Sequence, residues 1–193
     1  MRITKEKAEE NRLALVKAAG KLFRERGIDG VGVAEISKEA GLTHGALYAH
    51  FPSKEALAAE AFGHNADRAG VHREKVMVDG KPDFNAFLDF YLSTEQRDNP
   101  AHSCAMAASA SEIGRQDVSI SARYEASFQR MTAFFERHIA ETKPAAEARA
   151  EALAISAALI GGVSAARAVA KSNPALSDEI LRSTRQVIAQ LTK

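Results

Sequence analysis

The chain has 193 residues, of which 46% are hydrophobic, and its net charge is only +1 at pH 7. This composition can bury a core and argues against disorder, and the near-neutral charge excludes a uniformly basic nucleic-acid binder. Cys104 is the single cysteine, so no intrachain disulfide can form. The first residues, MRITKEKAEENR, lack the apolar core of a signal peptide, and no apolar run reaches about 18 residues. We therefore expect a cytoplasmic protein without a membrane span.

Helical periodicity dominates the N-terminal quarter. A first amphipathic helix is expected over residues 5–26, ended by Gly27, because apolar side chains recur at three-to-four spacing: Leu15, Ala18, Ala19, Leu22 and Phe23. A short second helix is expected over 33–40, between Gly32 and Gly41. A third helix over 44–50 is expected to have Thr43 as its N-cap, and Pro52 prevents its extension.

Six further helices are expected in the rest of the chain, which makes an all-α fold of about nine helices. Their predicted ranges are 54–78 with Ser53 as the cap, 83–97, 103–114, 117–142, 144–171, and a last helix capped by Ser177. The break after the fourth helix is expected at residues 80–82. Residues 1–52 are predicted to form a helix-turn-helix domain, and residues 53–193 a second, larger helical domain.

The third predicted helix has two unlike edges. Leu47 and Phe51 are four residues apart and can pack on Leu22, Phe23 and Ile36. The opposite edge carries small and hydrogen-bonding residues, with no Asp, Glu or Lys between Thr43 and Phe51, which suits a helix that enters a major groove beside phosphates.

Lys54 lies at the positive end of the next helix dipole, where a cation is unfavourable unless a phosphate binds there. Taken singly, Lys54 is equally well explained as an ordinary surface lysine, and Tyr48 is better explained as a packing residue. Only the combination of these residues with the carboxylate-free edge points to DNA.

The segment from Leu15 to Leu57 resembles the DNA-binding domain of the TetR/AcrR family of bacterial transcriptional regulators. The resemblance rests on the motifs LF-x-x-x-G, AG-[LV], LY-x-HF and SKE-x-L, and it covers about 45 residues. Helix order and length alone extend it to the remaining three quarters. It implies a homodimer of nine or ten helices that represses promoters from a palindromic operator and leaves the DNA when a small molecule binds.

The resemblance also implies roles for individual residues. Base reading falls to His44, Gly45 and Ala46, and phosphate contacts fall to four others: Thr43, Tyr48, His50 and Lys54. Many relatives carry Thr or Ser where Val31 and Gly32 stand, and Arg or Lys where Ala34 stands. The contacts of the second helix are therefore expected to be weaker here, although backbone N–H groups near Gly32 and Val33 can still meet a phosphate.

A dimer interface is expected on the last two helices, because residues 150–170 are apolar almost all round. Paired with the final helix, they can form a four-helix bundle with a second copy. The predicted interface residues are Leu159, Gly162, Val163, Ile180, Val187 and Ile188. The alternative is that both helices only complete the core of the monomer.

A pocket for a small apolar or electrophilic ligand is implied between the fourth and seventh predicted helices, although aromatic stripes are usually plain core. Its predicted lining is Phe62, Phe87, Tyr91, Cys104, Met106, Phe128 and Met131. No catalytic motif is present, and the spacing of His64, His72 and His102 fits no metal site, so neither an enzyme nor a cofactor is expected. Two alternatives stay open: a redox or electrophile sensor acting through Cys104, and a ligand-binding protein without a DNA function.

Overall fold

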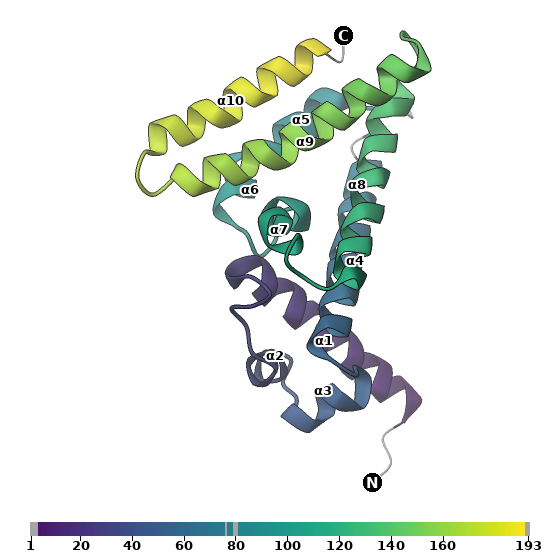
Figure 1. Cartoon of the computed structure of the whole chain (residues 1–193), viewed down its shortest axis with the longest axis vertical. Coiled ribbons are helices and arrows are strands. Elements are labelled where there is room, and N and C mark those ends of the chain that lie inside the picture. The colour runs from purple at the N-terminus through teal and green to yellow at the C-terminus, as the bar shows by residue number, and fades with distance from the viewer. Residues whose placement is uncertain (1–3, 76, 79–80, 192–193) are drawn as a thin grey trace.

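The computed structural model describes residues 4–75, 77–78 and 81–191, and the side chains within 66–82 are not described. In these residues the chain forms ten helices and one short two-stranded hairpin, which confirms the all-α class (Figure 1). The hairpin pairs β1 (Met77–Val78) with β2 (Lys81–Pro82) in antiparallel register, with Met77 opposite Pro82.

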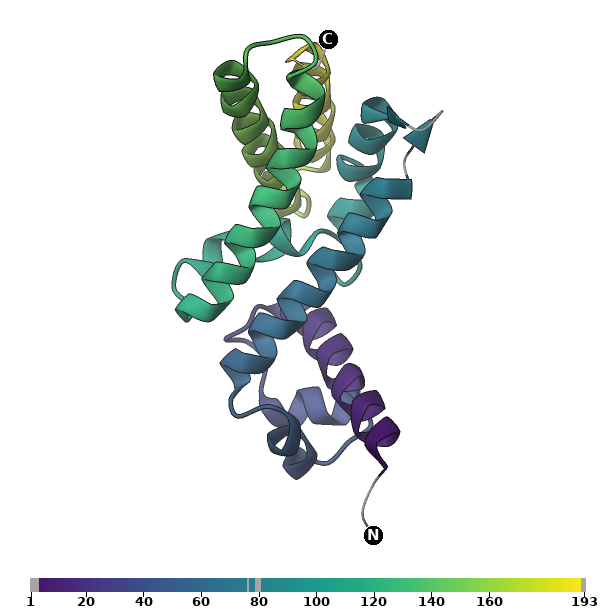
Figure 2. The same ribbon diagram turned by 90° about the vertical axis from the view of Figure 1, so that its right-hand side faces the viewer.

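The N-terminal part consists of α1 (Lys5–Arg26), α2 (Val33–Glu39) and α3 (His44–His50). Thr4 caps α1 by accepting a hydrogen bond from the Lys7 N–H, and Gly27 ends the helix with φ 79°. From α3 the chain enters α4 (Lys54–Lys75), which packs along α1 and then along α8 (Figure 2). The long helix α4 therefore connects the two ends of the molecule.

The C-terminal part contains α5 (Phe84–Tyr91), α6 (Thr94–Asp98), α7 (Ala105–Ile113), α8 (Val118–Ile139), α9 (Ala145–Val169) and α10 (Pro174–Leu191). The long helix α9 packs against α8 on one side and α10 on another, and α7 lies between α9 and the N-terminal helices (Figure 1). A single cluster of buried apolar side chains runs from α1 through α10.

The main differences between the structure and the sequence prediction concern the fourth, fifth and last predicted helices. The predicted helix over 83–97 is split, because Leu92 ends α5 and the Ser93 hydroxyl caps α6 through the Gln96 N–H. The fourth helix ends at Lys75 rather than 78, since β1 begins at Met77; Gly80 lies outside the described residues. The split of the predicted helix over 83–97 explains why ten helices are found in the described residues where about nine were expected.

Ser177 is not the cap of the last helix. Helix α10 begins at Pro174, and the Asn173 side chain accepts the capping hydrogen bond from the Leu176 N–H at 3.0 Å. The buried Ser177 hydroxyl instead donates to the Ala166 carbonyl of α9 at 2.7 Å. Ser177 lies inside the first turn of α10 and not before it, and its hydroxyl bonds to another helix instead of capping its own.

Candidate nucleic-acid interface

The turn between α2 and α3 depends on Gly41. Its φ of 69° lies in the left-handed region, and a Cβ added there would meet nothing within 4 Å. Glycine is therefore needed for the backbone angle and not for space. The Leu42 N–H closes the turn on the Ser37 carbonyl at 2.8 Å, which fixes where α3 starts.

The inner edge of α3 anchors the helix. Leu47 is 0% exposed and Phe51 is 3% exposed, and both belong to the buried cluster that contains Leu22, Phe23 and Ile36. The predicted packing of the helix-turn-helix is thus confirmed. Because the anchor is buried on one side only, the other edge of α3 is free to face a partner.

The outer edge of α3 is exposed and carries no carboxylate. Thr43, His44, Gly45 and Tyr48 are exposed, and Tyr48 keeps 50% of its surface. The His44 and Tyr48 rings meet edge to face at 5.4 Å. A Cβ added at Gly45 would meet nothing within 4 Å, so the monomer gives no steric reason for glycine at this position.

Three predicted residues lie differently from the rest. Ala46 and His50 are half-buried at the flank of the exposed edge. Thr43 occupies the N-cap position, but its side chain makes no capping hydrogen bond to α3, contrary to the prediction. At the start of α2, Gly32 is exposed and Val33 half-buried, and no side chain caps that helix.

Ion pairs neutralise the acidic residues of α2. Glu39 contacts Lys21 of α1 at 2.6 Å, and Glu35 pairs with Arg26. The hydrogen bond between Lys21 and Glu39 raises the pKa of Lys21 and lowers the pKa of Glu39, so both side chains remain charged at neutral pH. Both carboxylates of α2 therefore have cationic partners, which lowers their repulsion of a phosphate backbone.

Lys54 begins α4, as predicted, and Ser53 caps that helix through the Ala56 N–H at 3.2 Å. In the part of the chain that the structure describes, no ion pair involves Lys54. The charge of Lys54 acts on the adjacent Glu55, but the two form no ion pair. An ammonium group beside the positive end of a helix is an arrangement suited to a bound phosphate.

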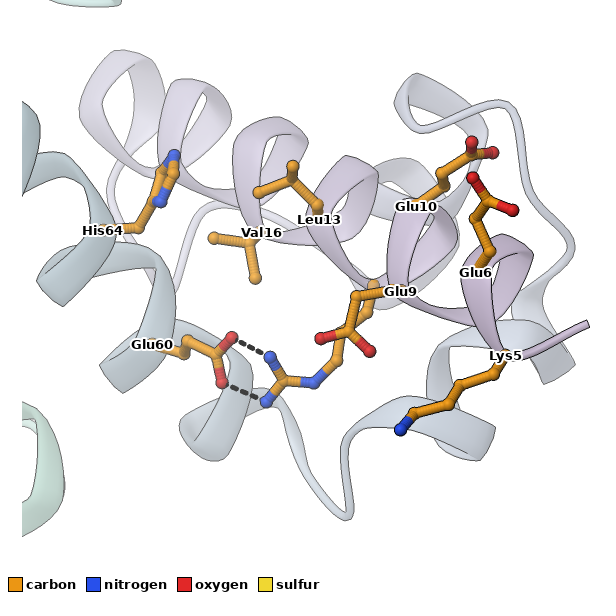
Figure 3. A pocket seen from close by; sticks show the side chains of 9 residues that line it. Lys5, Glu6, Glu9, Glu10, Leu13, Val16, Glu60 and His64 are labelled. Atoms are coloured by element: carbon orange, nitrogen blue, oxygen red, sulfur yellow. Dashed lines mark hydrogen bonds and ion pairs between the residues drawn. The ribbon is translucent and has the colours of Figure 1, made fainter.

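A concave pocket, which sequence reasoning missed, lies between α1 and α4 (Figure 3). It has a volume of about 870 Å³ and is lined by Lys5, Glu6, Glu9, Glu10, Arg12, Leu13, Val16, Glu60 and His64. Arg12 pairs with Glu60 through both carboxylate oxygens and lies 4.8 Å from the centre of the Phe51 ring. Its glutamates would repel phosphates, so this pocket is no part of a DNA-contacting surface.

The predicted ligand-pocket residues fall into two aromatic clusters. Phe62 lies 5.8 Å from Tyr124, which stacks on Phe128 at 6.4 Å. Phe87 lies 5.6 Å from Tyr91 and contacts the aromatic residues of α8. Met106 and Met131 are buried, and Cys104 is half-buried as the N-cap of α7. A ligand cavity among these residues stays a prediction.

Most of the predicted dimer residues pack inside the chain. Leu159, Val163 and Ile188 are at most 1% exposed, and Gly162 faces Thr184 of α10, whose methyl group would lie 3.0 Å from an added Cβ. Ile180 is half-buried, and only Val187, 55% exposed, is clearly accessible to a partner. Leu159, Val163 and Ile188 are therefore buried within one chain, and Gly162 packs against α10.

Two exposed apolar stripes lie on α9 and α10, and of their members Val187 was predicted as an interface residue from the sequence. The α9 stripe consists of Leu153, Ala154, Ala157, Ala158, Gly161 and Ala165, and the α10 stripe consists of Leu176, Val187 and Leu191. We call them together the α9–α10 face. The exposed positions alternate with the buried ones along each helix, but on α9 both sets are mostly apolar, so the sequence does not show which side is exposed.

Residues 15–61 match the family model described as bacterial regulatory proteins, tetR family. Among curated relatives, the HTH-type transcriptional regulator TtgR of Pseudomonas putida is 42% identical over 57 residues, which cover 30% of this chain and 27% of TtgR. The HTH-type transcriptional repressor BepR of Brucella suis is 38% identical over 78 residues, 40% of this chain and 35% of BepR. The matches thus span about a third or less of these relatives.

Solved structures extend the likeness to the whole fold. A TetR transcriptional regulator from Legionella pneumophila superposes with a TM-score of 0.79 at 19% identity over 100% of both chains. The reduced form of NemR from E. coli gives a TM-score of 0.74 at 16% identity, covering 93% of this chain and 95% of that one. With the helix-turn-helix geometry, these comparisons identify residues 15–61 as the N-terminal helix-turn-helix segment of the tetR family of bacterial regulatory proteins, within a chain whose overall fold is similar to that of solved TetR-family structures.

Proposed function

We propose that this protein is a cytoplasmic, homodimeric DNA-binding repressor that reads a near-palindromic operator through α3 and is released by a small apolar or electrophilic ligand. The outer edge of α3 carries the proposal: it is exposed, rich in small and hydrogen-bonding residues, free of carboxylates, and followed by the cation of Lys54. A solvent-facing edge without such a role usually carries Glu and Lys.

A gel shift with the DNA upstream of the chain's own coding sequence is the direct test. Two copies of α3 should contact successive major grooves about 34–36 Å apart. A ligand-binding protein without a DNA function would shift no duplex, even at low salt, and that result would reject the repressor in favour of this alternative.

The α9–α10 face supports the dimer. By length and composition, α9 is apolar enough to cross a membrane, and 44% of its most apolar window is buried within the chain. Its exposed side is made mostly of alanine and glycine, which permit close approach of another helix, whereas lipid-facing positions favour larger apolar side chains. A second copy of α9 and α10 is therefore the better cover for this face.

The ligand part of the proposal is supported by the packing of α4. This helix begins with Lys54 beside α3 and contains Phe62, whose ring lies close to that of Tyr124 in α8. A ligand inserted among these rings would displace α4 and hence its DNA-facing end. The coupling free energy between ligand binding and DNA binding is expected to be about 1–3 kcal/mol, and each ligand should weaken the binding of the other by the same factor.

Substitutions at the outer edge should separate affinity from specificity. Lys54→Ala and Tyr48→Phe should weaken binding to all duplexes alike, because each removes a phosphate contact, and Lys54→Ala should lower the salt slope by about one unit. His44→Ala should change which bases are preferred. Fluorescence anisotropy on a panel of operator variants at several salt concentrations measures both effects. A uniform loss across the panel for His44→Ala would contradict its base-reading role.

Gly45→Ala should stabilise the free protein while weakening DNA binding. An added methyl meets nothing within 4 Å in the monomer, and alanine in a helix is favoured over glycine by about 0.5–1 kcal/mol. On DNA the same methyl would lie between α3 and the base edges, so affinity should fall roughly tenfold, about 1.4 kcal/mol. Thermal unfolding measures the expected gain in stability of the free protein, and fluorescence anisotropy measures the expected loss of DNA affinity. If affinity does not change, Gly45 does not approach the bases.

A second candidate function, an electrophile or oxidant sensor, is favoured by the surroundings of Cys104. The residue is the N-cap of α7 and is half-buried. Burial lowers the pKa of Arg167, and an electrostatic contribution from Cys104 opposes this shift, so the two groups lie close enough to interact. The thiol therefore lies at a helix N-terminus near a guanidinium, the kind of electropositive and partly exposed position in which reactive cysteines occur. The similar fold of reduced NemR is consistent with such a role.

A sensor thiol should react with maleimide or peroxide in the folded protein, and the reaction should release DNA. The Cys104→Ser protein should then stay bound under the same treatment. Mass spectrometry of the intact protein and anisotropy follow the two steps. Reaction only after denaturation would identify Cys104 as a small packing residue.

A further inference from the structure

Helix α7 is held by polar contacts to the N-terminal helices at both of its ends. The first contact involves the loop that leads into α7, which contains Pro100 and Ala101. Arg24 of α1 donates through Nε to the Ala101 carbonyl at 2.9 Å and to the Pro100 carbonyl at 3.2 Å, and through Nη2 to the Ala101 carbonyl. The guanidinium therefore fixes the start of α7 against the C-terminal end of α1.

The other end of α7 is fixed to the loop between α1 and α2. Glu112 accepts a hydrogen bond from the Asp29 backbone N–H at 2.9 Å, and Gln116 donates to the Asp29 carboxylate at 3.0 Å. The Glu112 carboxylate also lies directly over Gly27, where an added Cβ would be 3.0 Å from its oxygen. Because Asp29 lies only a few residues before the first residue of α2, this contact constrains the helix-turn-helix itself.

On its opposite side α7 is fixed to the proposed dimerisation helix. The Ser164 hydroxyl of α9 donates to the Ala107 carbonyl at 2.7 Å, and Arg167 donates to the Ser103 hydroxyl at 3.0 Å. The junction of α1, α4 and α7 keeps a small cavity of about 20 Å³ bordered by Phe23, Ile28 and Ala105. Apolar packing there is incomplete, so the polar contacts have a larger share in holding α7 in place.

We propose that Arg24, Glu112 and Gln116 form a latch that sets the orientation of α2 and α3 relative to α9, and that displacement of α7 opens it. In a dimer built on α9, this orientation determines how the two α3 helices face the DNA. The regulatory meaning of the latch rests on the proposed function. The mechanical part, a fixed orientation of the helix-turn-helix, can be tested without DNA or ligand.

Spin labels at two exposed positions measure the orientation directly. In a Cys104→Ser background, Lys38→Cys on α2 and Glu125→Cys on α8 carry the labels, and labelled chains are diluted with unlabelled protein so that distances within one chain dominate. Glu112→Ala should widen the distance distribution about twofold or more. The same substitution should also accelerate hydrogen exchange of the Asp29 amide with solvent roughly tenfold or more, because the acceptor of this N–H is removed.

Two further variants distinguish the latch from general damage. Glu112→Gln keeps an acceptor oxygen and should preserve the narrow distribution, while Glu141→Ala removes an exposed glutamate elsewhere and should change nothing. If Glu112→Ala fails to fold by circular dichroism, the milder Gln116→Ala, which loses only the contact to the Asp29 side chain, should still widen the distribution. An unchanged distribution in the folded Glu112→Ala or Gln116→Ala protein overturns the proposal.

A DNA measurement then separates this proposal from the proposed function. The folded variants with a widened distribution should bind the upstream duplex about tenfold more weakly than the wild type, because α3 must be reoriented on binding. Unchanged affinity would show that the latch does not set the DNA-binding orientation. Failure of the wild-type protein to bind any duplex would reject the repressor, whereas the spin-label distances would still decide whether the latch exists.

Discussion

Leu47→Ala should destabilise the protein by about 2–5 kcal/mol, the range found when a fully buried leucine is truncated. Leu47 is 0% exposed and lies in the same buried cluster as Leu22, Phe23 and Ile36. Removing its side chain leaves a cavity beneath a helix of only seven residues, which has little stability of its own. We therefore expect loss of DNA binding beyond the loss of global stability, because so short a helix does not keep its position without this contact.

Chemical denaturation at a fixed protein concentration measures this effect, since the stability of a dimer depends on concentration. Leu13→Ala is the matched control: the same substitution at a residue of α1 that is 41% exposed. It should cost less than about 1 kcal/mol, because far less apolar surface leaves a buried environment. Equal losses in the two variants would contradict the assignment of Leu47 as the anchor of α3.

Val187→Glu should convert the dimer into monomers. Val187 is 55% exposed on the α9–α10 face, so a glutamate there does not disturb the fold of one chain. In a two-fold dimer the substitution occurs twice, and burial of an unpaired carboxylate costs several kcal/mol for each ion. The dimer dissociation constant should therefore rise more than about a thousandfold, and affinity for a two-site operator should fall at least about a hundredfold.

Val118→Glu provides the matched control, because Val118 is 78% exposed at the start of α8 and lies outside the α9–α10 face. This variant should remain a dimer and keep its DNA affinity. Sedimentation equilibrium gives the association state, and anisotropy with a whole and a half operator gives the affinity. A Val187→Glu protein that remains fully dimeric would place the interface elsewhere.

The expected loss of DNA binding has a different origin in the two variants. Leu47→Ala removes the support of α3 within each chain, so the half operator should lose affinity as well. Val187→Glu leaves the fold of each chain intact, so affinity for a half operator should be preserved. The additional affinity that a dimer gains from the second half-site should be lost. Comparing whole and half operators therefore separates the anchor of the recognition helix from the dimer interface.

Local chemistry determined the parts of this protein that the sequence predicted correctly. The left-handed turn at Gly41, the cap formed by Ser53 and the stop at Pro52 depend on residues within a few positions of one another, so the limits of α3 could be deduced directly. The periodicity around Leu47 also indicated which edge is buried. For the same reason the carboxylate-free outer edge of α3 follows from the residue types at positions 43–51 alone.

Tertiary structure alone decided which neighbour covers each helix face. Periodicity showed that α9 and α10 are apolar, but it did not reveal that Leu159, Val163 and Ile188 face their own chain while Val187 faces outward. The contacts of Arg24 and Glu112 join residues 76 and 83 positions apart along the chain. Such pairings depend on how whole helices pack, because a side chain's direction is fixed relative to its own helix axis and its partner is set by the position of another helix.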